Sequence, residues 1–308
     1  MDGIFNINKP SGTTSFSAVA RVRRLVNEPK AGHGGTLDPL ANGVLPVFLG
    51  QATRLAEYLM EYPKTYRANV ELGVVTDSYD AEGTVTNRGD VSGITQDAVA
   101  EALGRFRGEI LQKPPVFSAL KRQGQPLYKL ARQGQIVEID SRPASIYRLE
   151  LIVFEPPYLT LDVECSKGTY IRSLAHDMGA ALGCGAHLKG LIRTAYGPFD
   201  IKDSITLKYL EECILRGTWN ELVQPMDTVL SLWGKALLSD EQVELARHGA
   251  GLELEVGEGV ARLRAYDKSS NFVALLRFDA VSCLWNPQKV FHQPQTAPEN
   301  RPNPDMFP

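Results

Sequence analysis

The stretch SIYRLELIVFEPPYLTLDVEC, residues 145–165, decides the fold class of this 308-residue chain. Its two halves, 145–154 and 158–165, are rich in Leu, Ile, Val and Tyr, and Glu-Pro-Pro separates them. Two such runs joined by a short turn predict a β-hairpin, which pairs antiparallel strands. An amphipathic helix is predicted directly after the hairpin, over 169–182, and it ends at Gly183.

The sequence before this hairpin mixes strands and helices without a regular alternation. Residues 64–72 alternate in polarity, which places Tyr66, Ala68 and Val70 on one face of a strand. Strands are also predicted over 2–7 and 44–49, and helices from an N-cap at Ser15 to Val26, over 52–60 and over 95–106. Because no β-α-β unit repeats, this pattern favours an α+β fold over a doubly wound sheet.

The pattern changes beyond residue 230. Helical periodicity stops near 224–238, and short strand-like runs follow at 252–256, 260–266 and 272–278. We therefore expect a first domain over 1–230 and a small β module over 235–290. From residue 287 onward the chain has six prolines and almost no aliphatic side chains. Such a segment buries too little surface to offset ordering, so 291–308 is predicted to be a disordered tail.

Overall composition excludes several classes of protein. Hydrophobic residues make up 43% and charged residues 22% of the chain, which is ordinary globular usage rather than collagen-like, disordered or coiled-coil. No segment approaches the ~18 apolar residues that span a bilayer, and residues 1–5 lack the features of a signal peptide, so we expect a cytoplasmic protein with no membrane contact. The four cysteines form no C-x-x-C pair and have no His at ligand spacing, which predicts reduced thiols and no metal site.

The net charge of −3 argues against a globally basic nucleic-acid binder, but the charge is unevenly distributed. Between Arg105 and Arg132 there are seven basic residues and one acid, Glu109. Such a run is either a solvated surface or a face that contacts phosphates.

The most unusual local feature is GHGGTLDPLANG, residues 32–43, with four glycines and a proline. It lacks the spacings of nucleotide-binding loops. It is either a structural loop in which Asp38 caps a turn, or an exposed carboxylate whose backbone Pro39 extends and whose glycines allow close approach. A lone carboxylate makes a poor glycosidase, but it can attack as a nucleophile or stabilise a cationic sugar. Taken singly, His33, Tyr66 and Arg172 have equally ordinary explanations: a loop hydrogen bond, core packing and a solvated charge.

Several motifs together resemble one known family. AGHGGTLDPLANGVL, residues 31–45, closely resembles the signature of the TruB family of tRNA pseudouridine synthases. KTYR at 64–67, TDSYDAEG at 76–83, PVFSALK at 115–121, CSKGTYIR at 165–172 and GCGAHL at 183–188 resemble the remaining motifs in the family's order. The resemblance covers about residues 3–230. Each motif alone is weakly specific, whereas the set is highly specific.

The resemblance implies isomerisation of uridine 55 in the T loop of tRNA to pseudouridine. Asp38 then acts at C1′ of the target uridine, either by covalent addition or by supporting elimination to a glycal, and the freed uracil rotates and rejoins through C5. Tyr66 stacks on the base, and Arg172 pairs with Asp38 and keeps it ionised. No metal or redox cofactor is implied, because bond order is conserved overall.

The same matching implies roles for further residues. Tyr170 and Leu191 line the uracil pocket, Lys9 sits nearby and Asp80 orients Arg172. His33 fills the stack when the uridine flips out, and Gly34 beside it stands where family members often have Thr.

The resemblance also implies how the substrate is held. The fold is then a pseudouridine synthase catalytic domain with a mixed, mainly antiparallel sheet, followed by a small PUA-like RNA-binding β-barrel. The basic segment resembles the insertion that grips the T arm, with Lys121, Arg122, Lys129 and Arg132 as phosphate contacts. We expect a monomer with tRNA as its partner and no obligate protein partner. Two alternatives stay open: an RNA chaperone of the same fold, and a member of the RNA-guided dyskerin branch.

Overall fold

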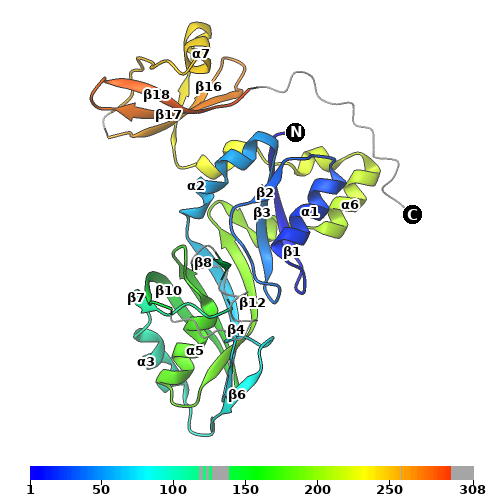
Figure 1. The fold of residues 1–308 in the computed structure, drawn as a ribbon, viewed down its shortest axis with the longest axis vertical. Helices are drawn as coiled ribbons and strands as arrows, with labels where there is room; N and C mark the ends of the chain where they lie inside the picture. The colour runs from blue at the N-terminus through cyan, green and yellow to red at the C-terminus, as the bar shows by residue number, and fades with distance from the viewer. Residues whose placement is uncertain (118–120, 123–124, 127–138, 258, 293–308) are drawn as a thin grey trace.

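The computed structural model describes residues 1–117, 121–122, 125–126, 139–257 and 259–292. Ten strands form one sheet: eight lie in the order β14-β1-β3-β12-β4-β11-β10-β7, while β2 pairs with β3 and β13 with β12 (Figure 1). Their bounds are β1 Gly3–Lys9, β2 Ala31–His33, β3 Asn42–Leu49, β4 Lys64–Leu72, β7 Gly108–Gln112, β10 Arg142–Glu155, β11 Tyr158–Cys165, β12 Ala186–Tyr196, β13 Phe199–Asp200 and β14 Ile205–Thr206. Within this described sheet β1 runs parallel to β14 and β3 to β12, and the other pairings are antiparallel.

The predicted hairpin is present as β10 and β11, which pair from Ile146 opposite Cys165 to Glu155 opposite Tyr158. The chain is α+β with a mixed sheet, as the sequence predicts. The helices are α1 Ser15–Leu25, α2 Ala56–Met60, α3 Gln96–Gly104, α5 Ile171–Ala181 and α6 Leu207–Arg216, with short 3-10 helices η1 Gly50–Leu55, η2 Ile201–Asp203, η3 Trp219–Leu222 and η4 Met226–Leu230. Two small hairpins, β5 Val74–Thr76 with β6 Val85–Arg88 and β8 Lys121–Arg122 with β9 Gln125–Pro126, lie outside the large sheet. No described helix has the length and apolar character needed to cross a membrane.

The sheet is covered differently along its width. In β3, Leu45 packs into the main core with side chains of α1 and α5, whereas Phe48 faces the opposite side and packs with Leu59 of α2. In β4 the predicted alternation is confirmed: Tyr66 and the even-numbered residues after it are buried, while Arg67 is exposed. Strand β12 lies between β3 and β4. It therefore joins the part of the sheet around β3, where both faces are covered, to the part beginning at β4, where one face is covered and the other is exposed.

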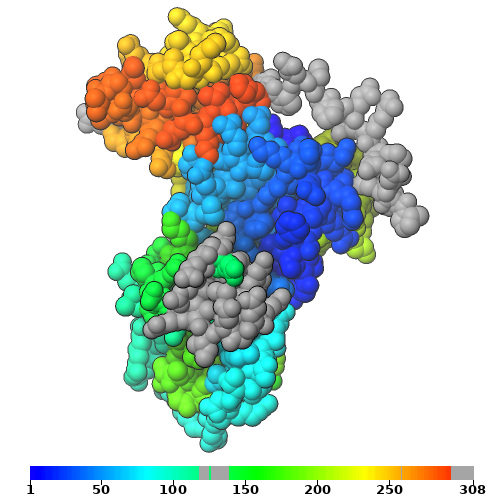
Figure 2. Space-filling model, viewed as in Figure 1, coloured from blue at the N-terminus to red at the C-terminus, as the bar shows by residue number. Residues whose placement is uncertain are grey.

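The C-terminal module has its own sheet and core. Strands β15 Gly234–Leu237, β16 Arg262–Tyr266, β17 Phe272–Asp279 and β18 Leu284–Val290 form a four-stranded sheet, and α7 Asp240–Arg247 packs on it. Leu275 and Phe291 join the core around Phe48, so the module is seated against the N-terminal part of the chain (Figure 2). Within the described residues β15 and β18 are the outer strands of this sheet, Trp285 of β18 forms a further antiparallel bridge with Leu252, and the four strands do not close into a barrel.

Three local predictions differ from the structure. Thr14, not Ser15, is the N-cap of α1, because the Ser15 hydroxyl is engaged with Leu37 instead. The single helix expected over 52–60 is a 3-10 turn followed by α2. Phe291, placed by the sequence in the tail, is 2% exposed in a core, so ordered chain extends to residue 292. The remainder of the predicted tail lies outside the described residues.

Candidate active site

Asp38 lies in the loop between β2 and β3, and hydrogen bonds from other segments of the chain hold this loop in place. The Ser15 hydroxyl accepts a hydrogen bond from the Leu37 N–H at 2.8 Å and donates to the Leu37 carbonyl at 3.0 Å. The Pro39 carbonyl accepts from the Gly12 N–H at 2.8 Å. The backbone on both sides of the Asp38 carboxylate is thus tied to the start of α1 and the turn before it.

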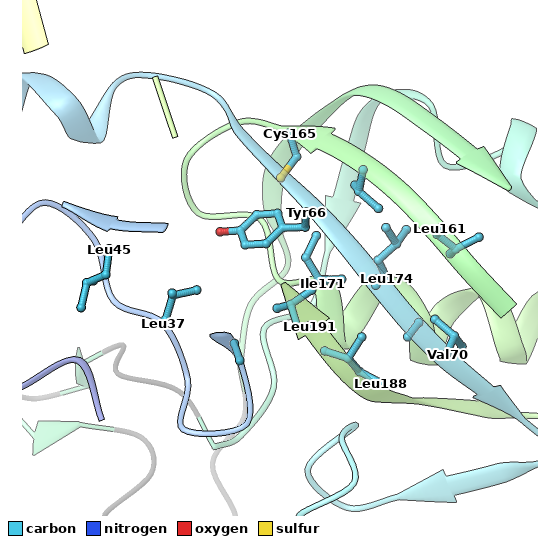
Figure 3. Packing of buried hydrophobic residues seen from close by; sticks show 14 of the residues in the cluster. Leu37, Leu45, Tyr66, Val70, Leu161, Cys165, Ile171, Leu174, Leu188 and Leu191 are labelled. Carbon is cyan, nitrogen blue, oxygen red and sulfur yellow. The ribbon is translucent and has the colours of Figure 1, made fainter. Parts of the chain in front are cut away.

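A cavity of about 190 Å³ opens beside this loop. Four elements converge on it: the loop, β4, the N-terminal end of α5 and β12. Its lining residues are Thr36, Leu37, Asp38, Tyr66, Thr169, Tyr170, Ile171, Arg172 and Leu191. Figure 3 shows the Tyr66 ring extending from β4 toward Leu37, with Ile171 and Leu191 beside it. Aromatic and aliphatic surface next to one carboxylate suits a flat, uncharged ring.

Arg172 links two carboxylates at the edge of this cavity. Its Nη2 lies 3.0 Å from the Asp38 Oδ2, and its Nη1 lies 3.2 Å from the Asp80 Oδ2. The Phe117 carbonyl accepts a further bond from Nη2 at 3.0 Å. Asp80 is itself fixed by donors from the Ser78 hydroxyl at 2.6 Å and the Glu82 N–H at 3.1 Å. The guanidinium is therefore held in one orientation before it meets Asp38.

The pKa of Asp38 is raised above its ordinary value. Burial at the cavity wall is the largest cause, and the attraction of Arg172 only partly offsets it, while the charge of Asp80 adds to the rise. The Asp38 side chain is still 43% exposed, and this exposed part faces the cavity. The sequence predicts that Arg172 keeps Asp38 ionised. In the structure Arg172 does lower the pKa of Asp38, but desolvation raises this pKa by more.

Tyr66 and Leu191 stand on neighbouring strands. Leu191 lies opposite Ala68 and Arg193 opposite Tyr66 in the β12–β4 pairing, so these side chains share a face. Burial raises the pKa of the Tyr66 phenol, and the charge of Arg193 offsets this only in part. Tyr66 therefore stays neutral and presents an aromatic face with a polar end.

Lys9 and His33 flank the loop without touching the Asp38 carboxylate. The fully buried Lys9 ammonium donates to the carbonyls of Pro10 at 2.9 Å and Thr13 at 2.6 Å, and burial lowers its pKa to about 8. His33 is half-buried at the end of β2, and its Nδ1 accepts from the Gly35 N–H at 3.3 Å. Burial and the charge of Arg193 lower the pKa of His33, so the ring is neutral at pH 7.

Comparison with known proteins assigns the chain to a family. Residues 23–171 match the TruB family pseudouridylate synthase N-terminal domain, and residues 172–231 match the tRNA pseudouridylate synthase B C-terminal domain. The tRNA pseudouridine synthase B of Dehalococcoides mccartyi is 46% identical over 294 residues, covering 96% of this chain and 98% of that protein. The chain belongs to the TruB family.

A second sequence relative and two solved structures support this assignment. The tRNA pseudouridine synthase B of Pseudomonas aeruginosa is 43% identical over 278 residues, covering 89% of this chain and 91% of that protein. The crystal structure of a Cbf5-Nop10-Gar1 complex is similar with a TM-score of 0.71 and 30% identity, covering 94% of this chain and 85% of that one. A structure of an H/ACA ribonucleoprotein bound to a substrate RNA containing 2′-deoxyuridine is similar with a TM-score of 0.72 and 27% identity. The match covers 97% of this chain and 88% of that one. The fold is that of the pseudouridine synthases.

Gly34, the residue beside His33, is closely packed against core side chains. A Cβ placed on Gly34 would lie 2.8 Å from the Leu59 Cδ2 and 3.2 Å from the Phe48 ring. This chain fills the space beside His33 with its own core side chains. The hydrogen bond that His33 accepts from the Gly35 N–H helps to orient its ring.

The structure brings eight of the predicted site residues, from Lys9 to Leu191, around one loop and cavity. The basic segment is described only in part. Arg105 pairs with Glu101, and Arg107 donates to the Leu149 carbonyl, so these two cations have intramolecular partners. Lys121 and Arg122 form β8, while Lys129 and Arg132 lie outside the described residues.

Sequence reasoning missed one residue that shapes the cavity. The buried Gln112 side chain accepts from the Tyr170 N–H at 2.7 Å and donates to the Tyr170 carbonyl at 2.9 Å. It thereby fixes the residue that precedes α5 and, through it, the start of the helix that carries Arg172. A glutamine at the end of a strand gives no local signal for such a role.

Proposed function

We infer that this chain isomerises uridine 55 in the T loop of tRNA to pseudouridine. One observation carries the inference: in a TruB-family chain, the aspartate of the signature loop faces a cavity and is paired with a buried arginine. The N1–C1′ bond breaks and a C5–C1′ bond forms, while a proton leaves C5 and N1 gains one. Bond order is conserved, so the reaction needs no metal or redox cofactor.

Asp38 is proposed to act at C1′. The carboxylate either adds to C1′ or supports elimination to a glycal, and both routes use its ionised form. Arg172 keeps a share of Asp38 ionised despite burial, and Asp80 holds Arg172 in place. The pKa of Asp38 is raised by burial, and the charge of Arg172 opposes this rise. Such a combination of a perturbed acid and a nearby cation occurs at catalytic centres.

The cavity is proposed to hold the uracil while it is free. Tyr66 stacks on the base, and Tyr170 and Leu191 line the remaining pocket. Retaining the detached base and excluding water favour rejoining through C5. Lys9 supports the turn beside the loop. His33, neutral and flat, is proposed to fill the gap that the flipped uridine leaves.

The T arm is proposed to contact the basic segment, with Lys121, Arg122, Lys129 and Arg132 meeting phosphates. The C-terminal module over 235–290 is proposed to be a PUA-like RNA-binding module, although its four described strands form an open sheet rather than a closed barrel. Arg262 and Arg277 lie opposite each other on β16 and β17. Arg262 lies over the Trp233 ring at 5.0 Å, and Arg277 lies close enough to Asp279 to contribute to the lowered pKa of that carboxyl; these two neighbouring cations support contact with an anionic strand.

The chain is further proposed to act as a cytoplasmic monomer without a protein partner. Identities of 43–46% to proteins named tRNA pseudouridine synthase B, over most of both chains, favour a stand-alone tRNA enzyme. The structural similarity to Cbf5 keeps the RNA-guided branch as the alternative.

The test is incubation of the purified chain with an unmodified tRNA transcript, followed by carbodiimide mapping. Pseudouridine at position 55 is expected with the protein alone, and Asp38→Asn serves as the matched inactive control. Binding of tRNA without modification would favour an RNA chaperone. Activity only with an added guide RNA or protein would favour the dyskerin branch.

A further inference from the structure

Near its C-terminal end, strand β12 carries Arg193 and Tyr196, two buried side chains with polar groups that the proposed chemistry does not use. The Nε of Arg193 donates to the Val44 carbonyl at 2.7 Å, and its Nη2 donates to the Gly35 carbonyl at 3.2 Å. The Tyr196 hydroxyl donates to the Gly34 carbonyl at 2.7 Å. Gly34 and Gly35 come before Asp38 and Val44 comes after it, so both ends of the Asp38 loop are bonded to one strand.

The burial of Arg193 is energetically unusual. Its side chain is about 1% exposed, and no carboxylate of the described residues pairs with it. The guanidinium instead faces the two carbonyl dipoles and the Tyr196 ring at 4.8 Å, and the Lys64 ammonium lies 4.6 Å from the same ring. A buried cation without an anion is unfavourable unless such contacts compensate for desolvation. Of the compensating groups, the Gly35 carbonyl belongs to the Asp38 loop and the Val44 carbonyl to β3 directly after it.

The loop also lies too close to β12 for ordinary side chains. A Cβ on Gly43 would be 2.3 Å from the Arg193 carbonyl, and φ of Gly43 is +101°. A Cβ on Gly35 would be 3.1 Å from the Tyr196 hydroxyl. In the sheet, Arg193 is the neighbour of Gly43 on one side and of Tyr66 on the other. Strand β12 therefore sets the separation between the loop and the tyrosine on which the base is proposed to stack.

We propose that Arg193 and Tyr196 are positioning residues that hold the Asp38 loop against β12, so that the carboxylate reaches C1′ of a base stacked on Tyr66. The inference rests on the proposed function. Each residue acts on Asp38 through backbone carbonyls, and Arg193 also lies beside the Tyr66 phenol. A misplacement of 1 Å in a reacting group can reduce a rate about 100-fold, so loosening the loop should slow catalysis rather than weaken binding.

Tyr196→Phe tests this with the smallest change, since it removes one hydroxyl and keeps the ring that faces both cations. Its matched control is Tyr158→Phe, which removes an exposed hydroxyl at the start of β11 and likewise keeps the ring. We expect Tyr196→Phe to lower the single-turnover rate on tRNA about 10- to 100-fold. The Kd for tRNA should stay within twofold, and amide hydrogen exchange should accelerate in residues 34–44 while that of β10 and β11 is unchanged. The control should change neither the rate nor exchange in the loop.

Arg193→Lys provides a second measurement, because lysine keeps the charge but replaces the planar guanidinium, whose Nε and Nη2 each bond one carbonyl, with a single nitrogen. It should reproduce the loss of rate. The inference is overturned if Tyr196→Phe retains the wild-type rate, if Arg193→Lys is fully active, or if the loss comes entirely from weaker tRNA binding. A wild-type chain that makes no pseudouridine refutes the proposed function instead, so the two failures are distinguishable.

Discussion

Replacing Arg172 by methionine should move the acid limb of the pH–rate profile to higher pH. Arg172 is the largest influence that lowers the pKa of Asp38, so its removal raises that pKa and reduces the ionised fraction at any given pH. At 3.0 Å and an effective dielectric constant of about 20, the attraction is about 5 kcal/mol. Because Asp38 is 43% exposed to the cavity, we take about half of this, 2–3 kcal/mol, which corresponds to about a 30- to 150-fold loss of rate at pH values below the wild-type acid limb and to a smaller loss above it.

The measurement is the single-turnover rate of pseudouridine formation between pH 5 and pH 9 with saturating enzyme. Arg67→Met is the matched control, because Arg67 forms a two-point pair with Asp162 at 2.8 Å on the exposed face of the sheet. The control should keep both the rate and the position of the acid limb. An acid limb of Arg172→Met that coincides with the wild-type limb would refute the electrostatic argument, even if the overall rate had fallen.

Four further outcomes are expected. Asp38→Asn should abolish turnover while tRNA binding stays within a few-fold, and retention of more than a few per cent of the rate would remove Asp38 from its role. Alanine at Lys121, Arg122, Lys129 and Arg132 should weaken tRNA binding and reduce the slope of log K against log salt by roughly 0.7–0.9 per lost phosphate contact; an unchanged slope would mean a solvated surface. His33→Ala should slow modification of folded tRNA far more than that of a short unstructured RNA, whereas Tyr66→Ala should impair both alike; equal losses for His33→Ala would contradict gap filling. Because burial lowers the pKa of Lys9 from 10.5 to about 8, the unfolded state binds more protons between these pH values, so the stability of wild type relative to Lys9→Met should rise from pH 8 to 10.5. Thermal unfolding measured across that range checks it.

The parts of the fold that the sequence predicts are those that local periodicity determines. Strand β4 alternates because one face is buried and the other is solvated, and that pattern is readable without the rest of the chain. The β10–β11 hairpin is equally local. The N-cap of α1 shows the limit: Thr14 and Ser15 are both suitable caps, and the choice depends on Ser15 bonding to Leu37, which is distant in sequence.

The candidate site could be predicted only in part for the same reason. The family motifs identify Asp38 and Arg172, but nothing in their spacing gives the order of influences on the Asp38 pKa, because burial depends on how four elements enclose the cavity. Likewise, Gln112 and Arg193 act through backbone groups of other segments. A side chain whose partners are carbonyls leaves no charge pattern or spacing in the sequence.

The glycines of the Asp38 loop explain why so many distant side chains converge on its backbone. Gly35 and Gly43 permit the close approach to β12, and Gly43 adopts a positive φ that other residues resist. The same glycines make the unbound loop conformationally free, which works against a carboxylate that must meet one carbon atom. Hydrogen bonds from other segments restrict the loop instead. Ser15 bonds to Leu37, and Arg193 and Tyr196 donate to backbone carbonyls before and after Asp38. In this fold the placement of Asp38 is therefore set by the strands and helix around the loop rather than by the loop itself.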